Sequence, residues 1–353
     1  MDLRFFTKFL KKYSFFFIIV FFISCKLPFL GPRVKTRGAD NEILVVYNES
    51  EKEAVKILKK VLEEEYLTPQ NEYLFKIIPI WAQDFTSYYD YKNKIILGVY
   101  KTETQPIYQK VFHRYVGERE YLKVARNAYV FGDFTVGIWS RRSDKLIEFV
   151  KKNALKIKKI FEKRYEELLR SKLYYVGLER WLIKDVYQTY GFTFDFPIGW
   201  KYVHIDKNFV SFAKHVPDRF LFIYREWKTR DINNIEKLLD LRDSLCKIYY
   251  EGDRVLRGEG WIKTWKVKFL GVPAVKVYGV WQNKEFVRGG PFEFYAFNYK
   301  GKFYMIDFGV FAPGQEKLPF IKRLEILVKT FRFRKYPPRI RKRKKKEKKK
   351  YGT

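Results

Sequence analysis

Cysteine and histidine are scarce in this chain, with two and three among 353 residues. Two cysteines can form at most one disulfide, so the fold cannot depend on a disulfide framework. The histidines, His113, His204 and His215, are dispersed, and no cysteine cluster accompanies them. Because a zinc site needs three or four ligands at suitable spacing, the sequence predicts no metal site and no cofactor.

Long apolar runs and nucleotide-binding motifs are missing beyond residue 25. No later run approaches the roughly 20 apolar residues of a membrane-spanning helix. There is neither a phosphate-binding loop nor a dinucleotide-binding glycine pattern. Asp195 and Asp307 each lie in an aromatic strand segment, where alternation places polar residues on the solvent face by default. Paired carboxylates could hydrolyse glycosides, but the sequence does not place these two together. No catalytic residue is therefore predicted.

The first 25 residues have the layout of an exported lipoprotein. Four basic residues within the first twelve precede an apolar run, residues 14–23, that is too short to cross a bilayer. Ser24 and Cys25 follow, as in signals that are cleaved before a cysteine that then carries lipid. We expect lipidation of Cys25 and anchoring in the cell membrane or outer membrane, facing the periplasm or the exterior. A cleaved signal with an ordinary Cys25, or an uncleaved anchor, is the alternative.

The second cysteine, Cys246, lies in a segment with helical spacing of apolar residues. If Cys25 carries lipid, Cys246 has no partner for a disulfide. It is expected to be a buried free thiol that serves as a small apolar side chain.

Positive charge is abundant and is concentrated at the C-terminus. The formal net charge is +32, and residues 332–350 contain thirteen basic residues against Glu347 alone. Because like charges repel, residues 335–353 are predicted to be an unfolded tail. The expected partners outside the cytoplasm are anionic lipid or envelope polymer, a solubilising role is the alternative, and nucleic acid is not expected. The predicted contact residues are Arg339, Arg341, Lys342, Arg343, Lys344, Lys345, Lys346, Lys348, Lys349 and Lys350.

The order of apolar segments predicts an α+β fold. Residues 1–24 are the signal, 25–40 a tether, and 41–185 an N-terminal unit of alternating strands and helices. Residues 186–334 are predicted to form an antiparallel sheet with two packed helices, before the tail 335–353.

In the N-terminal unit, strands are predicted at 42–47, 76–80, 94–99 and 127–139. A helix is expected to begin at the capping box Ser50–Glu53, and a long helix at 143–171.

In the C-terminal domain, helices are expected at 232–249 and 318–330. Gly289 and Gly290 are interpreted as a turn or bulge that enters the strand beginning at Phe292. Most of the five tryptophans of this half are expected in the core. The other predicted strands are 192–196, 201–205, 208–212, 220–224, 265–270, 274–281 and 303–311.

The last quarter of the chain carries a pattern of short motifs. It runs from Gly279-Val-Trp281 through Gly289-Gly-Pro-Phe292 and Val310-Phe-Ala-Pro313 to Arg323-Leu-Glu-Ile-Leu327. This pattern resembles an uncharacterised envelope lipoprotein family found mainly in Bacteroidota, which is known as a domain of unknown function. Arg288 stands where that family usually has methionine. The resemblance implies an envelope lipoprotein and supplies no activity.

Together these features predict a membrane-anchored envelope lipoprotein that acts as a non-catalytic binding or structural module. The alternative is a hydrolase that acts on envelope glycan or peptide material.

Overall fold

The computed structural model describes residues 35–112 and 119–333. Cys25, His113 and the basic tail lie outside these ranges. Contacts divide the described chain into two compact units, the first with residues 35–59, 77–112 and 119–153, and the second with 60–76 and 154–333. Each unit is built from segments that are not consecutive in the sequence. The predicted boundary between residues 185 and 186 assumes two continuous domains, and it stays a prediction. The predicted mixture of helices and sheets is confirmed.

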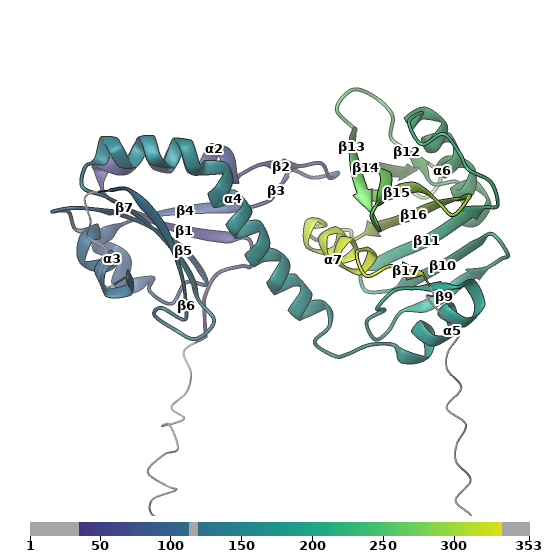
Figure 1. Cartoon of the computed structure of the whole chain (residues 1–353), viewed down its shortest axis with the longest axis horizontal. Helices are drawn as coiled ribbons and strands as arrows, with labels where there is room; N and C mark the ends of the chain where they lie inside the picture. Colours follow the sequence, from purple (N-terminus) through teal and green to yellow (C-terminus); the bar gives the residue numbers. More distant parts are fainter. Residues whose placement is uncertain (1–34, 113–118, 334–353) are drawn as a thin grey trace, which may run out of the picture. The chain divides into compact units, whose positions relative to one another are not determined.

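The first unit contains a five-stranded sheet in the order β4-β1-β5-β7-β6 (Figure 1). Strands β1, β5 and β7 are parallel and β6 is antiparallel to β7. β5 and β7 are buried along their whole length, as expected for parallel strands that are covered on both faces. The strands are β4 (Lys76–Trp81), β1 (Glu42–Tyr47), β5 (Asn93–Val99), β7 (Phe134–Ser140) and β6 (Tyr121–Arg126).

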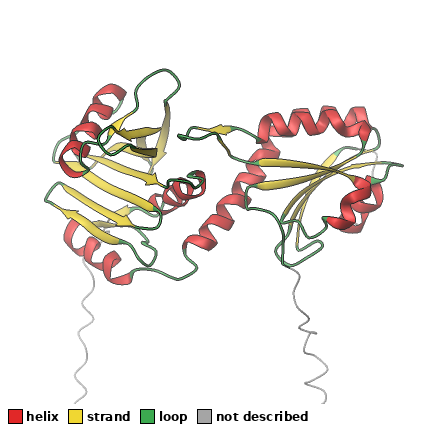
Figure 2. Ribbon diagram, turned by 180° about the vertical axis from the view of Figure 1, so that it is seen from behind, coloured by secondary structure: helices red, strands yellow, loops and turns green. Residues whose placement is uncertain are grey.

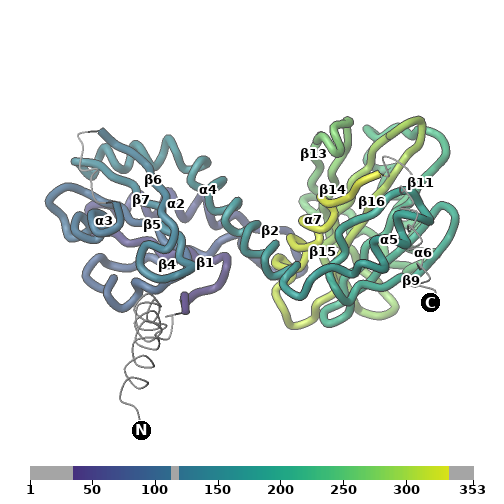
Figure 3. The backbone as a smooth tube through the Cα atoms, turned by 60° about the horizontal axis from the view of Figure 1, so that its bottom comes forward, coloured from purple at the N-terminus to yellow at the C-terminus, as the bar shows by residue number. Residues whose placement is uncertain are grey.

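Helices α2 (Lys52–Leu62) and α3 (Thr104–Phe112) belong largely to this unit, and α4 (Ser143–Leu173) begins in it. Short 3-10 helices, η1 (Glu49–Glu51) and η2 (Ala82–Ser87), follow β1 and β4. Figure 3 shows α3 beside the strands, and its Tyr108 and Phe112 pack with Trp139 of β7.

Two local predictions for the first unit are wrong. The helical segment after β1 begins with η1, and the backbone N–H of Asn48 donates to Glu51 at 2.7 Å, so the cap lies two residues before Ser50. Residues 127–139 are not one strand, because a turn over 127–133 separates β6 from β7.

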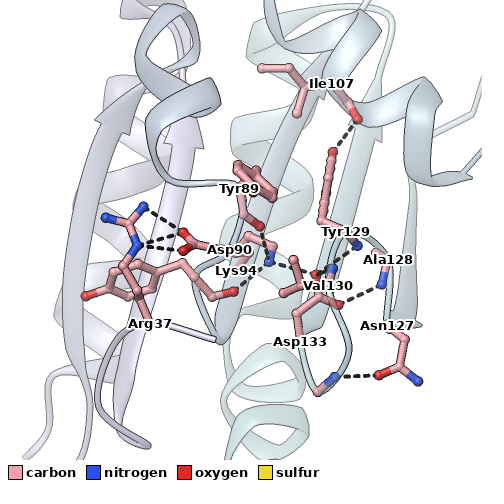
Figure 4. A network of polar contacts seen from close by, with 12 residues as sticks. Arg37, Tyr89, Asp90, Lys94, Ile107, Asn127, Ala128, Tyr129, Val130 and Asp133 are labelled. Carbon is pink, nitrogen blue, oxygen red and sulfur yellow. Dashed lines mark hydrogen bonds and ion pairs between the residues drawn. The ribbon is translucent and has the colours of Figure 1, made fainter. Parts of the chain in front are cut away.

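A buried ion pair anchors that turn (Figure 4). One carboxylate oxygen of Asp133 accepts from Lys94 Nζ at 2.9 Å, and the carboxylate also accepts from the backbone N–H groups of residues 128–130. Lys94 also donates to the carbonyl groups of Tyr89 and Tyr91, at 2.9 and 2.6 Å. All three ammonium donors are therefore used, which makes this pair a structural anchor.

The second unit is built on an antiparallel sheet in the order β12-β14-β15-β16-β11-β10-β9, with β13 paired to β14. Figure 2 shows helices beside this sheet. Its strands are β9 (Lys201–Ile205), β10 (Phe209–Lys214), β11 (Asp218–Glu226), β12 (Arg254–Val255), β13 (Ile262–Phe269), β14 (Val272–Asn283), β15 (Arg288–Tyr299) and β16 (Lys302–Phe311). Its helices are α5 (Arg180–Tyr190), α6 (Ile235–Tyr249) and α7 (Leu318–Val328), besides the end of α4.

Both faces of this sheet are covered. Along β15, Phe292 and Phe294 pack in the cluster that contains the apolar side chains of α6. The alternate residues Tyr295 and Phe297 pack in the cluster that contains those of α7 and α5. This alternation follows from the period of two along a strand. The central strands consequently have no solvent face. Asp307 of β16 is fully buried, whereas alternation along the strand predicted that it would face solvent.

Two short antiparallel strand pairs complete the unit. β8 (Phe192–Thr193) pairs with β17 (Arg332–Phe333), so the strand predicted over 192–196 is shorter than expected. β2 (Glu65–Tyr66) pairs with β3 (Glu72–Tyr73), within a segment that lies far earlier in the sequence than the rest of this unit. Among the residues that the structure describes, no helix combines the length and apolar character that a membrane span requires.

Candidate functional site

The candidate site of the second unit begins with the β2–β3 hairpin, which caps α7. The carboxylate of Glu72 accepts hydrogen bonds from the backbone N–H groups of Lys317 and Leu318 at 2.7–2.9 Å. These groups have no partner within the helix, and the negative charge also suits the positive end of the helix dipole. Tyr278 of β14 donates to the carbonyl of Leu67, beside the hairpin. The hairpin therefore fixes the start of α7 against the sheet.

Three charged side chains meet beneath this hairpin. Lys276 Nζ of β14 lies 3.0 Å from Glu293 of β15 and 2.9 Å from Glu325 of α7. Tyr66 of the hairpin donates its hydroxyl to the other oxygen of Glu293 at 3.0 Å. Lys322 adds a further contact to Glu325 at 3.2 Å. We call Lys276, Glu293 and Glu325 the charged triad.

The pKa values of the triad follow from burial and the neighbouring charges. Burial raises the pKa of Glu293, and the negative charge of Glu325 adds to this effect. Burial also acts on Glu325, but the nearby ammonium groups, Lys322 first, prevail and lower its pKa. For Lys276, the attraction of the two carboxylates overcomes burial and raises the pKa. The two glutamates thus differ, with Glu293 the more easily protonated.

A pocket of about 420 Å³ lies beside the triad, between the second half of α4 and α7. Its walls combine four lysines and three glutamates with an apolar part in which the side chains are buried. Glu325 links the pocket to the triad, whereas Glu293 is not among the lining residues. We call this the α4–α7 pocket, and it is lined by Leu74, Lys159, Glu162, Lys163, Tyr165, Glu166, Leu169, Lys322, Glu325, Ile326 and Lys329.

The chemistry that this arrangement supports is binding of charged groups. Two carboxylates with divergent pKa values are a pattern found in acid–base catalysis. However, Glu293 has no exposed side-chain surface and is enclosed by Lys276 and Tyr66, so a substrate in the pocket would not reach it. The lysines and glutamates of the pocket walls can instead pair with carboxylate and ammonium groups of a ligand.

A second buried pair holds α6 on the opposite face. Arg242 Nε donates to Asp307 at 2.8 Å, and the guanidinium lies 4.0 Å from the ring centre of Phe292. Burial raises the pKa of Asp307 to about 6, although Arg242 opposes the shift. Cys246 lies one turn further along α6 as a buried free thiol, and burial raises its pKa to about 12. Such a thiol is unsuited to nucleophilic catalysis at neutral pH.

The other candidate residues of the sequence have separate partners. Asp195 pairs with Arg332 at 2.7 Å and does not share a partner with Asp307. His204 packs against Tyr249, and the exposed His215 contacts Asp218 at 2.8 Å. Within residues 35–112 and 119–333, no three His, Cys, Asp or Glu side chains gather in a way that could hold a metal ion.

The interpretation of the glycine pair is also wrong. Gly289 and Gly290 lie within β15 and pair with β14, and neither has a positive φ. A Cβ at Gly290 would collide with the carbonyl oxygen of Val310, so glycine is required for close approach of two strands rather than for a turn. The five tryptophans of this half differ in burial. Trp200 and Trp281 lie in the core, Trp227 and Trp265 are exposed, and Trp261 is partly buried.

Sequence reasoning did not identify the triad or the hairpin. One signal was present, because Lys276 and Glu293 interrupt strands that are otherwise apolar or aromatic. Glu72 gave no such signal, since its partners lie 245 and 246 residues away.

Residues 179–330 match the model of a protein family described as a domain of unknown function, DUF4837. This match fits the expected resemblance to an uncharacterised domain family, while the link of that family to lipoproteins of Bacteroidota stays a prediction. No curated protein sequence matches the chain.

Three solved structures show distant similarity. A Bacteroides thetaiotaomicron protein is 12% identical with a TM-score of 0.22, and the match covers 42% of this chain and 48% of that protein, about half its length. LpqN of Mycobacterium tuberculosis, described as involved in cell envelope biogenesis, is 12% identical with a TM-score of 0.26 and coverage of 40% and 81%. A STAR-related lipid transfer protein fragment of Xanthomonas axonopodis is 9% identical with a TM-score of 0.22 and coverage of 37% and 92%. Likenesses at these scores carry no argument about ligand or activity.

Proposed function

We propose that this protein is an envelope lipoprotein, anchored by lipid on Cys25, whose second unit binds a ligand through the α4–α7 pocket without catalysing a reaction. The anchor is supported by the basic, apolar and small residues that precede Cys25. The burial of Cys246, which is the other cysteine, agrees with a thiol that has no disulfide partner.

Lipidation can be tested directly by labelling cells with a fatty-acid analogue. The wild-type chain should carry the label and stay with the membrane fraction, and Cys25→Ser should lose both properties. Partition of the unlabelled wild-type chain into buffer without detergent would contradict the anchor.

The observation that carries the binding function is the mixed charge of the α4–α7 pocket. Lysines and glutamates alternate along one side of α4 above buried apolar residues, and Lys329 lies 3.7 Å from Glu166, so both signs of charge line one small volume. A ligand with neighbouring ammonium and carboxylate groups, such as a short peptide of the envelope, would satisfy both. The basic body of the protein does not by itself explain this arrangement, because three carboxylates line the same pocket.

The test compares a tripeptide that has free termini with the same tripeptide blocked at both ends. We expect the free form to raise the melting temperature and the blocked form to have little effect. Lys163→Gln should weaken binding by about two- to fivefold, as for one exposed ion pair of up to about 1 kcal/mol. Lys156→Gln is the matched control, because Lys156 is an exposed lysine of the same helix that does not line the pocket.

The same mixtures separate binding from hydrolysis. Mass spectrometry should recover the tripeptide intact after prolonged incubation. Cleavage that the pocket variant abolishes would favour the hydrolase alternative, and equal stabilisation by both peptide forms would contradict the proposed recognition.

We further propose that the basic tail, residues 339–350, contacts anionic surfaces. Each basic residue near such a surface contributes about 1 kcal/mol, and salt screens the attraction. In the Cys25→Ser background, binding to anionic vesicles should require the tail and should fall as salt rises. Equal binding by tailed and tail-less chains would leave the tail a solubilising role.

A further inference from the structure

A second and smaller pocket in the same unit is lined by four cations, and no carboxylate of the described residues lines it. Its volume is about 120 Å³, and Trp200 forms part of its wall. The cations come from the end of α4, the end of β10, the start of β11 and α7, and they are Lys172, Lys214, Arg219 and Arg323. This pocket shares no lining residue with the α4–α7 pocket, so it is a separate feature.

Backbone carbonyl groups fix two of these cations. Nε and Nη2 of Arg219 donate to the carbonyl groups of residues 215–217 at 3.1–3.3 Å. Lys214 Nζ donates to the carbonyl of Ile198 at 2.7 Å. Within the described part of the chain, Nη1 of Arg219 and two ammonium protons of Lys214 remain for another acceptor. Carbonyl groups orient these side chains without neutralising their charge.

The carboxylates that act on Lys214 and Arg219 are Glu179 and Asp218, and neither lines the pocket. Glu179 accepts from a backbone N–H group at 2.9 Å, and Asp218 contacts the ring of His215 at 2.8 Å. Burial, followed by repulsion from the neighbouring guanidinium groups, lowers the pKa of Lys214. Burial and repulsion from Arg323 likewise lower the pKa of Arg219. An anion in the pocket would relieve this repulsion.

We propose that this pocket binds a phosphate group. Arginine presents a planar set of donors that matches phosphate oxygens, and lysine supplies a compact positive charge. The volume admits one tetrahedral oxyanion but leaves little room for a larger attached group, which would extend through the pocket opening. The proposal does not depend on lipidation of Cys25 or on peptide binding in the α4–α7 pocket.

Phosphate groups of this kind occur as inorganic phosphate and as glycerophosphate headgroups of lipids. The experiment therefore uses three probes with the full-length chain in neutral detergent: inorganic phosphate, glycerophosphoglycerol, and micelles containing phosphatidylglycerol. Sodium chloride at equal ionic strength corrects for screening. The basic tail is expected to attract anions as well, but it is identical in every variant that is compared.

Lys214→Gln and Arg219→Gln should each weaken binding of inorganic phosphate by about tenfold or more, because a charge-assisted hydrogen bond is lost. Lys268→Gln removes the same charge from an exposed position of β13 and should leave binding unchanged. Arg219 also holds the 215–217 loop, so circular dichroism must show that its variant is folded, and Lys214→Gln provides an independent measurement.

The outcomes distinguish the sources and can overturn the proposal. If the two pocket variants weaken the binding of all three probes, the site accepts a phosphodiester headgroup. If they weaken the binding of inorganic phosphate alone, it is a site for the free anion. No saturable effect of any probe on the wild-type chain, or an equal loss in Lys268→Gln, would refute a phosphate site in this pocket.

Discussion

Replacing Lys276 by methionine should destabilise the second unit more than any change of an exposed lysine. Methionine keeps much of the apolar stem but removes the ammonium that contacts Glu293 at 3.0 Å and Glu325 at 2.9 Å. Glu325 retains Lys322 as a partner, whereas Glu293, within the described residues, retains the hydroxyl of Tyr66 as its direct contact. The cost therefore falls mainly on Glu293, which has no exposed side-chain surface.

The magnitude follows from leaving one buried charge without its counter-charge. Breaking a buried ion pair by removing one partner costs about 3–5 kcal/mol. Burial already raises the pKa of Glu293 above its ordinary value of 4.5, and loss of Lys276 should raise it further. A folded-state pKa above the unfolded value gives stability that is present at low pH and is lost as pH rises through the raised pKa. The variant should thus be less destabilised at about pH 5 than at about pH 8.

Urea denaturation and hydrogen exchange of peptides from β15 would measure this loss at both pH values, with the wild-type chain as reference. Lys266→Met, at an exposed position of β13, is the matched control. Adding Glu293→Gln to Lys276→Met should restore part of the stability and remove the extra pH dependence. A loss no larger than that of Lys266→Met, or one that is equal at both pH values, would refute the reasoning.

Three further changes test the packing of the second unit. Glu72→Ala should lower its free energy of unfolding by about 1–3 kcal/mol in urea denaturation, because two N–H groups of α7 lose their acceptor, and an unchanged value would contradict the cap. Gly290→Ala should lower the melting temperature, because the collision with Val310 lowers the free energy of unfolding by about 1–3 kcal/mol. An unchanged melting temperature would exclude such a close approach of Gly290 to Val310. In the Cys25→Ser chain, Cys246 should react with a thiol reagent at about pH 8 only after denaturant is added, since its pKa is about 12; rapid reaction of the folded chain would contradict its burial.

Elements with strong local patterns could be predicted from the sequence. The apolar run of β1 was predicted with its observed bounds, and the long helix from Ser143 was placed within two residues of its end. The turn over residues 127–133 was missed because Tyr129, Val130 and Phe131 continue the apolar character of a strand. Its conformation depends on hydrogen bonds to Asp133, and a propensity pattern does not contain them.

The site could be predicted less well because its contacts are distant in sequence. Tyr66 and Glu293 are separated by 227 residues, and Lys276 and Glu325 by 49. Alternation also misled the placement of Asp307, since the rule of one wet face fails when helices cover both faces of an antiparallel sheet. A charged residue in a strand of this unit therefore predicts a buried counter-charge as readily as a solvent face.

The charged clusters of this protein differ in how far their charge is neutralised, and this difference separates the buried structural pairs from a site for an anion. Lys94 uses all its donors and faces the carboxylate of Asp133, so nothing remains for a ligand. In the triad, the ammonium of Lys276 faces two carboxylates, Lys322 supplies a second ammonium to Glu325, and Glu325 is the triad member that lines a pocket. Lys214 and Arg219 are fixed by uncharged carbonyl groups and meet other cations across their pocket. An oriented but uncompensated positive charge favours an anion from outside the chain, which places the phosphate proposal at this pocket rather than at the better-buried pairs.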